Sequence, residues 1–177
     1  MAVYALGDKI PKIAESAYIH PQASVIGDVI IGERVFLAPM SSVRGDIGII
    51  TIGDETNVQD GAVVHSTESH DTTIGKRVNI GHNASVHAKF IDDYAAIGMG
   101  AVLMLHSVVA KGALIGNGAL LHSKTITEPY KVYAGVPAKY LRDLEQDDPA
   151  RIAIERYVET YVRNAVRYPS ELRRIDL

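Results

Sequence analysis

The chain has 177 residues, of which 47% are hydrophobic and 22% are charged, and its formal net charge is −3. Like charges do not form runs, so we expect no nucleic-acid-binding stripe and no polybasic membrane arm. The chain contains no cysteine, which excludes thiolate metal sites and is compatible with the cytoplasmic location that we expect. No apolar run approaches the length of a membrane span, and residues 1–6 lack the pattern of a secretory signal.

Residues 1–18 carry no repeat and are predicted to form an N-terminal lead-in. From residue 19 onwards, an aliphatic residue recurs at every sixth position. The spacing is interrupted by a three-residue slip after Val43, by an insertion at Ser66–Thr73 and by one missing residue after Val86. These aliphatic repeat positions are Ile19, Val25, Ile31, Leu37, Val43, Ile52, Val58, Val64, Ile74, Ile80, Val86, Ile91, Ile97, Leu103, Val109, Ile115 and Leu121.

A period of six fits no helix, but it fits a short strand, a turn and the next short strand. Three such strands can close one triangular coil, and successive coils can stack as parallel ladders. We therefore predict a mainly β fold, with a β-helix domain over residues 19–126. A β-sandwich or barrel is the alternative, but its strands recur every eight to twelve residues, and Asn117-Gly118 is the one hairpin dipeptide of the Asn-Gly type here.

The pattern stops after Ile126, and residues 127–146, which contain Pro129, Gly135 and Pro137, are predicted to form a loop. The segment Asp147-Asp148-Pro149 is typical of a helix start, so a C-terminal helix is predicted over residues 147–168, packing on the prism. Pro169 is expected to end this helix, which leaves residues 169–177 as a tail. The helical apolar stripe consists of Ile152, Ile154, Tyr157, Val158, Tyr161, Val162, Ala165 and Val166.

The repeat also predicts which side chains stack on each other. If each coil contains three hexapeptides, then Arg44, His65 and His87 each follow an aliphatic repeat position of the same vertical file and point outward. Adjacent coils lie about 4.8 Å apart. Two imidazoles on adjacent coils can therefore share one tetrahedral metal ion. His106 has no partner by this register, and His122 is predicted to lie on the surface.

His82 falls at the neighbouring edge of the triangle, in the same register as Asp60 and beside Gln59. One chain is not expected to bring His82 around the corner to the His65–His87 pair, whereas a second copy packed side by side can do so. A site made of all three histidines therefore implies an intersubunit metal centre, and a three-faced prism favours a cyclic homotrimer.

Taken in order, several motifs make the sequence resemble the gamma-class carbonic anhydrases, over about residues 10 to 140. This resemblance implies a left-handed β-helix, a homotrimer and a metal bound by three histidines across the subunit interface. The hand is taken from the resemblance, because spacing alone does not supply it. The motifs are Val43-Arg-Gly-Asp, Asn57-Val-Gln-Asp-Gly, His65, Ile80-Gly-His-Asn-Ala, His87 and Ile97-Gly-Met-Gly-Ala.

The resemblance also assigns roles to residues. His65, His82 and His87 resemble the metal ligands, and Gln59 resembles the residue that hydrogen-bonds the solvent on the metal. The set Arg44, Asp46 and Asp60 resembles the interface ion pairs that order the site. Tyr161 resembles a helix tyrosine that reaches the metal water in some members, with Tyr157 as a rival.

The implied reaction is the reversible hydration of carbon dioxide to bicarbonate by a hydroxide on the metal. The expected ion is Zn²⁺, with Fe²⁺ or Co²⁺ as alternatives. The sequence departs from the family at Ala88-Lys89 and Leu105-His106 and lacks the acidic loop that accepts protons in the prototype. His70, in the Ser66–Thr73 insertion, is an alternative proton shuttle, although an exposed loop histidine is the simpler interpretation.

Two other functions remain open. Hexapeptide-repeat acyltransferases, which use coenzyme A, share the prism and the trimer and often carry a segment like Ala134-Gly-Val-Pro-Ala-Lys139. They need one histidine as a general base, so three histidines in metal register exceed that requirement. The second alternative is a catalytically weak trimer that keeps its metal as a structural clamp. Metal content, followed by rates of hydration and of acyl transfer, separates the three.

Overall fold

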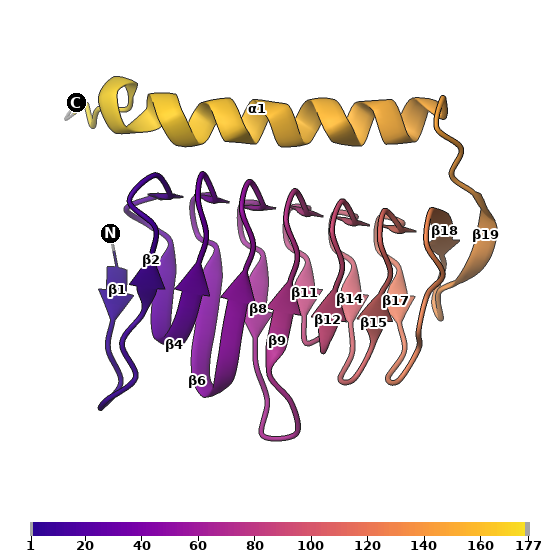
Figure 1. Cartoon of the computed structure of the whole chain (residues 1–177), viewed down its shortest axis with the longest axis horizontal. Helices are drawn as coiled ribbons and strands as arrows, with labels where there is room; N and C mark the ends of the chain where they lie inside the picture. The colour runs from indigo at the N-terminus through magenta and orange to yellow at the C-terminus, as the bar shows by residue number, and fades with distance from the viewer. Residues whose placement is uncertain (1, 176–177) are drawn as a thin grey trace.

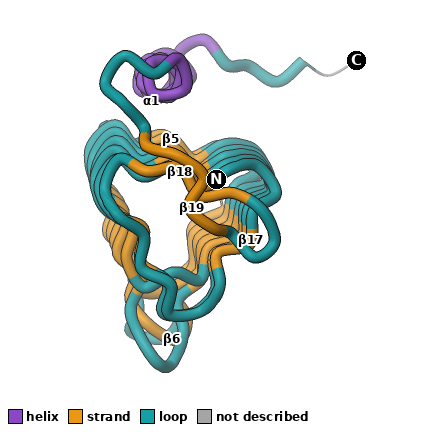
Figure 2. Tube along the Cα trace, turned by 90° about the vertical axis from the view of Figure 1, so that its right-hand side faces the viewer, coloured by secondary structure: helices purple, strands orange, loops and turns teal. Residues whose placement is uncertain are grey.

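The computed structural model of the chain describes residues 2–175 and consists of stacked coils with one long helix lying along them (Figure 1). Viewed along the stack, the coils form a triangle, and the helix lies outside one of its sides (Figure 2). From β1 to β18, the strands of successive coils pair in parallel within each face. The predicted parallel β-helix with a C-terminal helix is therefore confirmed.

One face of the prism, which we call the helix face, lies under the C-terminal helix. Its strands follow the order β19-β18-β16-β13-β10-β7-β5-β3. The helix contacts β3, β5, β7 and β10 of this face. The strand bounds are β3 Tyr18–Ile19, β5 Phe36–Leu37, β7 Asn57–Val58, β10 Asn79–Ile80, β13 Ala96–Ile97, β16 Leu114–Ile115, β18 Lys131–Ala134 and β19 Lys139–Asp143.

The other two faces share two long strands, β4 and β6, which run from one face into the next. The second face follows the helix face in each coil and contains β1 Ala2–Tyr4, the first part of β4 Ser24–Ile31 and of β6 Ser42–Ile52, β8 Val63–His65, β11 Ser85–Val86, β14 Val102–Leu103 and β17 Leu120–Leu121. The third face contains β2 Lys12–Ile13, the later part of β4 and β6, β9 Thr72–Ile74, β12 Phe90–Ile91 and β15 Val108–Val109.

The aliphatic repeat positions form the core of the prism. Each lies in a strand, and the most exposed of them, Ile19, retains 7% of its accessible surface. Burying one such side chain contributes about 1.5–3 kcal/mol, so the repeat positions together make a large favourable contribution to folding. Close stacking also explains the glycines that follow many repeat positions, because a Cβ on Gly98 would lie 2.5 Å from the backbone nitrogen of Asn117.

Both ends of the β-helix extend beyond residues 19–126. The expected lead-in contains β1 and β2, which pair with β4. The segment expected as a loop, residues 127–146, contains β18, which pairs in parallel with β16, and β19, which pairs antiparallel with β18. The six-residue spacing continues here through Thr127 and Tyr133, which are 3% and 7% exposed. The repeat was missed because polar and aromatic residues replace the aliphatic ones.

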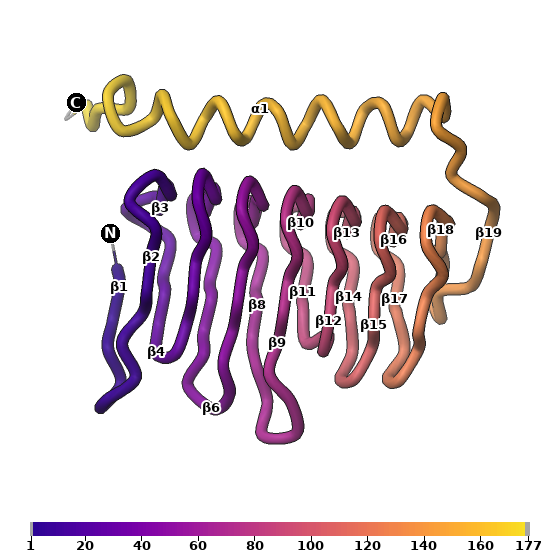
Figure 3. The backbone as a smooth tube through the Cα atoms, viewed as in Figure 1, coloured from indigo at the N-terminus to yellow at the C-terminus, as the bar shows by residue number. Residues whose placement is uncertain are grey.

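Two of the three interruptions of the repeat, the slip and the insertion, have different structures. The three-residue slip lies within β6 and produces a register shift against β4 between Gly27 and Val29, so it is a bulged strand. The Ser66–Thr73 insertion makes the loop between β8 and β9 that extends beyond the other coils (Figure 3). Its ends are joined by a bridge between Thr67 and His70, and β9 already begins at Thr72.

The C-terminal helix α1 spans Pro149–Glu171. Asp148 caps its first turn by accepting a hydrogen bond from the Ala150 N–H at 2.8 Å. The helix continues past Pro169, which was expected to end it, because a proline in the last turn removes a single intrahelical hydrogen bond. Within residues 2–175, no helix has the length and apolar character needed to cross a bilayer.

Candidate metal centre

His65 and His87 lie side by side at one corner of the prism. His65 ends β8 and His87 follows β11, and these strands pair with Val64 opposite Val86. The imidazole centroids are 5.5 Å apart and the rings are nearly perpendicular, at 89°. We call this edge, between the second and third faces, the histidine corner. The structure thus brings together the two histidines that the repeat register predicts as neighbours.

Asp46 and Arg44 surround His65 at the histidine corner. The Nε2 of His65 donates to Oδ1 of Asp46 at 3.0 Å, and Arg44 pairs with the other carboxylate oxygen of Asp46. Burial raises the pKa of Asp46, but the hydrogen bonds from His65 and Arg44 outweigh it and hold that pKa below its usual value. Asp46 is therefore a carboxylate that orients His65 and leaves Nδ1 as the free ring nitrogen.

His87 is kept neutral by its surroundings. Burial lowers the pKa of His87, and the neighbouring His65 and Arg44 lower it further because a second positive charge there is unfavourable. A neutral imidazole offers the lone pair that a metal ion requires. The environment of His87 therefore suits ligation at neutral pH.

His82 lies at the neighbouring corner, between the helix face and the second face. Its Nδ1 is 3.0 Å from Oδ2 of Asp60, one coil away, and the His82 side chain is 41% exposed. The second face separates His82 from the histidine corner. Accordingly, no group of three or more potential ligand side chains within residues 2–175 of one chain could hold a metal ion.

The donor set nevertheless fits a metal shared between two chains. His65 and His82 each use one ring nitrogen on a carboxylate, which leaves the other nitrogen available. Carboxylate-to-histidine contacts of this kind are typical of metal ligands, because they fix the ring and increase its basicity. Three imidazoles form a common catalytic zinc set, and they leave one coordination position open.

Gln59 lies beside His82 and has a fixed orientation. Its Nε2 donates to Oδ1 of Asn57 at 3.0 Å and to Oδ1 of Asn79 at 2.8 Å. This leaves Oε1 of Gln59 as the atom available to a ligand. The sequence assigned no role to Asn57, which was named only as part of a motif, or to Asn79. Both precede an aliphatic repeat position of the same file, and that shared register was the signal that could have identified them.

A hollow of about 400 Å³ lies between the C-terminal helix and the corner that carries His82. Gln59, His82, Tyr157 and Tyr161 all line it. Tyr161 also packs against Phe36, with ring centroids 5.3 Å apart. Burial raises the pKa of Tyr161, and the nearby Asp60 raises it further, so Tyr161 is a neutral hydroxyl at physiological pH. Tyr161 and its rival Tyr157 therefore both border the hollow that leads to His82.

His106, which was expected to lack a partner, contacts His70. Their ring centroids are 4.7 Å apart, and the backbone N–H of His106 donates to Nε2 of His70 at 3.1 Å. The other ring nitrogen of His70, Nδ1, donates to the carbonyl of Asp71 at 2.9 Å. The missed contact arises because the β8–β9 loop places His70 against a turn two coils further along the stack, which a repeat register does not describe.

Comparisons with known proteins agree with this architecture. No family model matches the chain. The carnitine operon protein CaiE of Proteus sp. (strain LE138) is 34% identical over 148 residues, covering 84% of this chain and 75% of CaiE. Gamma carbonic anhydrase 1 from mitochondria of Arabidopsis thaliana is 38% identical over 152 residues, covering 82% of this chain. The chain spans 55% of the length of that plant protein.

Solved structures match over nearly the whole chain. A hexapeptide transferase family protein from Anaplasma phagocytophilum has a TM-score of 0.85 at 33% identity and covers 94% of this chain and 96% of its own. A Bacillus cereus protein described as an acetyltransferase has a TM-score of 0.92 at 33% identity and covers 97% of this chain and 99% of its own. These matches confirm the hexapeptide-repeat, left-handed β-helix fold.

Proposed function

The chain belongs to the hexapeptide-repeat family of the gamma carbonic anhydrases and CaiE proteins, and from this premise we propose that it hydrates carbon dioxide reversibly to bicarbonate. The site is a metal centre shared between subunits of a homotrimer. One observation carries the proposal. His65 and His87 lie side by side at one corner of the prism, and His82 lies at the neighbouring corner, where its Nδ1 contacts the carboxylate of Asp60. The second face, between these corners, is then the subunit interface.

The metal ligands in this proposal are His65 and His87 of one protomer and His82 of its partner. When bound by three neutral imidazoles, Zn²⁺ supplies a Lewis acid that brings the pKa of water to about 7. Fe²⁺ or Co²⁺ fits the same ligands. Asp46 and Asp60 hold the imidazoles in position, and Arg44 neutralises Asp46 so that the corner does not accumulate negative charge.

Gln59 acts on the reacting oxygen. The amide nitrogen of Gln59 donates to Asn57 and Asn79. The carbonyl oxygen of Gln59 is therefore free to accept the hydrogen bond of the attacking water or hydroxide. This hydrogen bond orients a lone pair of the attacking oxygen toward carbon dioxide. Tyr161 borders the hollow as a hydroxyl group that can donate to bicarbonate. Carbon dioxide is small and apolar, and it enters through the hollow beneath the helix.

The proton released by the reaction leaves through solvent and buffer. His70 already makes hydrogen bonds with both ring nitrogens, so a proton can enter its ring only if one of these contacts breaks. We therefore do not assign the shuttle to His70. The cytoplasmic location expected from the sequence remains a prediction.

The acyltransferase alternative has one structural feature in its support. The segment Ala134–Lys139 connects β18 to β19 at the end of the prism, and Val136 in it is 72% exposed. This end is several coils away from the paired histidines, which have no role in an acyl transfer placed there. Acetylation of amine or hydroxyl acceptors by acetyl-coenzyme A, with no metal requirement, would support this alternative.

The decisive experiment is metal analysis of the purified protein together with stopped-flow carbon dioxide hydration. We expect about one metal ion per chain in the wild type and a loss of both metal and hydration in His82→Ala. His122→Ala, an exposed histidine farther along the histidine corner, is the matched control and should retain both. A His82→Ala protein with its full metal content would contradict the shared site.

A further inference from the structure

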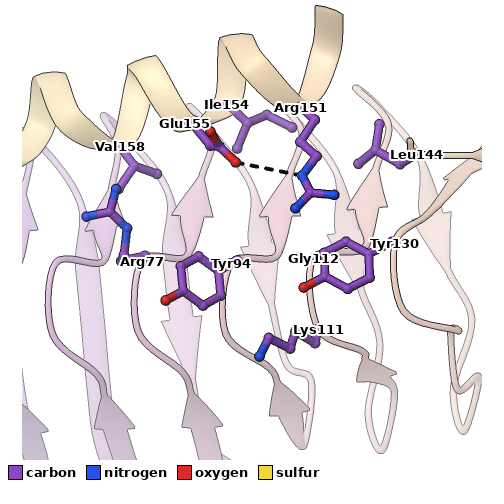
Figure 4. A pocket seen from close by; sticks show the side chains of 10 residues that line it. All are labelled: Arg77, Tyr94, Lys111, Gly112, Tyr130, Leu144, Arg151, Ile154, Glu155 and Val158. Atoms are coloured by element: carbon purple, nitrogen blue, oxygen red, sulfur yellow. Dashed lines mark ion pairs between the residues drawn. The ribbon is translucent and has the colours of Figure 1, made fainter. Parts of the chain in front are cut away.

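A second cavity lies at the third edge of the prism, between the third face and the helix face, on the other side of the helix from His82. Its volume is about 220 Å³. It is lined by coil residues, including Tyr94, Lys111 and Tyr130, and by residues of the helix, including Arg151 (Figure 4). We call this edge the tyrosine corner. The proposed metal site does not use it, and the proposed trimer interface is on the opposite side of the triangle.

The chemistry of this edge changes along the stack. In successive coils, one turn residue at this edge adopts a positive φ. The first three of these residues, Arg34, Glu55 and Arg77, form a ladder of ion pairs in which Glu55 binds both arginines. Arg77 also pairs with Glu159 of the helix. In the later coils the ladder is replaced by aromatic residues and a glycine. The turn residues are Arg34, Glu55, Arg77, Tyr94, Gly112 and Tyr130.

Gly112 allows the Tyr130 ring to form one wall of the cavity. It stands between Tyr94 and Tyr130 in the stack, and a Cβ at this position would lie 2.4 Å from Cε1 of Tyr130. The ring of Tyr130 therefore occupies the space that a side chain at Gly112 would fill. Tyr94 and Tyr130 both line the hollow, and Figure 4 shows their rings on either side of it.

Two cations face this hollow without a strong acidic partner. The guanidinium of Arg151 lies over the Tyr130 ring, 4.7 Å from its centroid, and its nearest carboxylate contact is with Glu155 at 3.7 Å. The ammonium of Lys111 lies 5.6 Å from the centroid of Tyr94 and makes no salt bridge within residues 2–175. In Figure 4 Arg151 lies on the helix side of the two tyrosine rings and Lys111 lies on the opposite side.

From this arrangement we infer that the tyrosine corner binds a small organic anion with a planar body. The carboxylate or phosphate lies between Lys111 and Arg151, where Arg151 can offer two parallel N–H groups. The planar body lies against the tyrosine rings. A volume of 220 Å³ is below the ~300–1,000 Å³ of sites for drug-sized ligands, which favours a small metabolite over a whole nucleotide.

Calorimetric titration with phenyl phosphate and benzoate tests this inference on the intact protein. We expect at least one of these probes to bind, and the one that binds identifies the headgroup. Binding should weaken about tenfold in both Lys111→Gln and Arg151→Gln, because each removes a charged donor. Arg156→Gln, on the same helix but outside the cavity, is the matched control and should bind as the wild type does.

Two further probes separate the anion from the planar body. Inorganic phosphate should bind more weakly than phenyl phosphate because it does not contact the tyrosines, and neutral benzamide should not bind. The inference is overturned if neither phenyl phosphate nor benzoate binds, or if Lys111→Gln and Arg151→Gln bind them as tightly as the control. Inorganic phosphate that binds as well as phenyl phosphate would also overturn it. Thermal unfolding of each variant establishes that it is folded.

Discussion

Asp60 and His82 lie on adjacent coils of one corner, with Oδ2 of the carboxylate 3.0 Å from Nδ1 of the imidazole. Asp46 and His65 form the equivalent pair at the next corner, with Oδ1 also 3.0 Å from a ring nitrogen. Each carboxylate fixes one nitrogen and makes the other a better electron donor. In the proposed shared site, each corner supplies such a histidine to the same metal ion.

Removing the charge of Asp60 should weaken metal binding. In Asp60→Asn, His82 loses the carboxylate that holds Nδ1, and we expect metal affinity to fall about 10–100-fold. Competition with a chelator measures this affinity. Asp147→Asn, a change at an exposed residue between β19 and the C-terminal helix, is the control. Equal affinities in the two variants would show that Asp60 does not support His82.

Gln59 should affect catalysis more than metal binding. In Gln59→Ala the carbonyl that orients the attacking oxygen is lost, and we expect kcat/KM for hydration to fall about 10-fold or more with metal content unchanged. Stopped-flow hydration and metal analysis of the same sample provide the two values. A variant with full activity would remove Gln59 from the mechanism.

The stability of the prism should depend on its repeat positions. Ile97 is fully buried, so Ile97→Ala should lower the free energy of unfolding by about 2–5 kcal/mol. Ile126→Ala removes the same atoms from a side chain that is 71% exposed, and it should cost less than about 0.5 kcal/mol. Denaturant unfolding compares the two, and similar losses would contradict the assignment of Ile97 to the core.

Glu55 should make stability depend on acid pH. Hydrogen bonds from Arg34 hold the pKa of Glu55 below its usual value despite partial burial, and Arg77 adds to this effect. A depressed folded-state pKa stabilises the protein above the unfolded-state value of about 4.3, and this contribution is lost as the pH falls through the folded-state pKa. Glu55→Gln should therefore be about 1 kcal/mol less stable than the wild type at pH 7.

The same comparison at lower pH tests the sign of the effect. The difference between Glu55→Gln and the wild type should shrink as the pH falls below the unfolded-state pKa of about 4.3 and through the lower folded-state pKa, because the wild-type side chain then also becomes uncharged. Denaturant unfolding at pH 7 and near pH 3 measures it. A difference that grows toward acid pH would contradict the depressed pKa.

Much of the fold could be predicted from sequence because one physical rule, an aliphatic side chain pointing inward at every sixth position, governs each coil. The rule fails where a side chain that is not aliphatic fills the inward position. Tyr133 fills an inward position because its hydroxyl accepts a hydrogen bond from the backbone N–H of Glu128 at 3.0 Å. A pattern restricted to aliphatic residues therefore ends one coil too early.

The site was less predictable than the fold. Register alone places His65 beside His87, because both follow aligned repeat positions. It does not reveal that Arg44 and Asp46 form a pair within one chain around His65, since Asp46 lies in the bulged part of β6. Nor does it reveal that the β8–β9 loop brings His70 to His106, because loop conformation depends on side-chain contacts that no period encodes.

Subunit complementation tests the central claim most directly. His65→Ala and His82→Ala homotrimers should each lack metal. In a mixed trimer, a His82→Ala subunit keeps His65 and His87, and a neighbouring His65→Ala subunit supplies His82, so one complete site forms. When equal amounts of the two variants assemble at random, about three quarters of the trimers contain both variants, and each of these holds one intact site out of three. Metal content and hydration should therefore recover to about a quarter of the wild-type values. No recovery in verified mixed trimers would contradict a site shared between subunits.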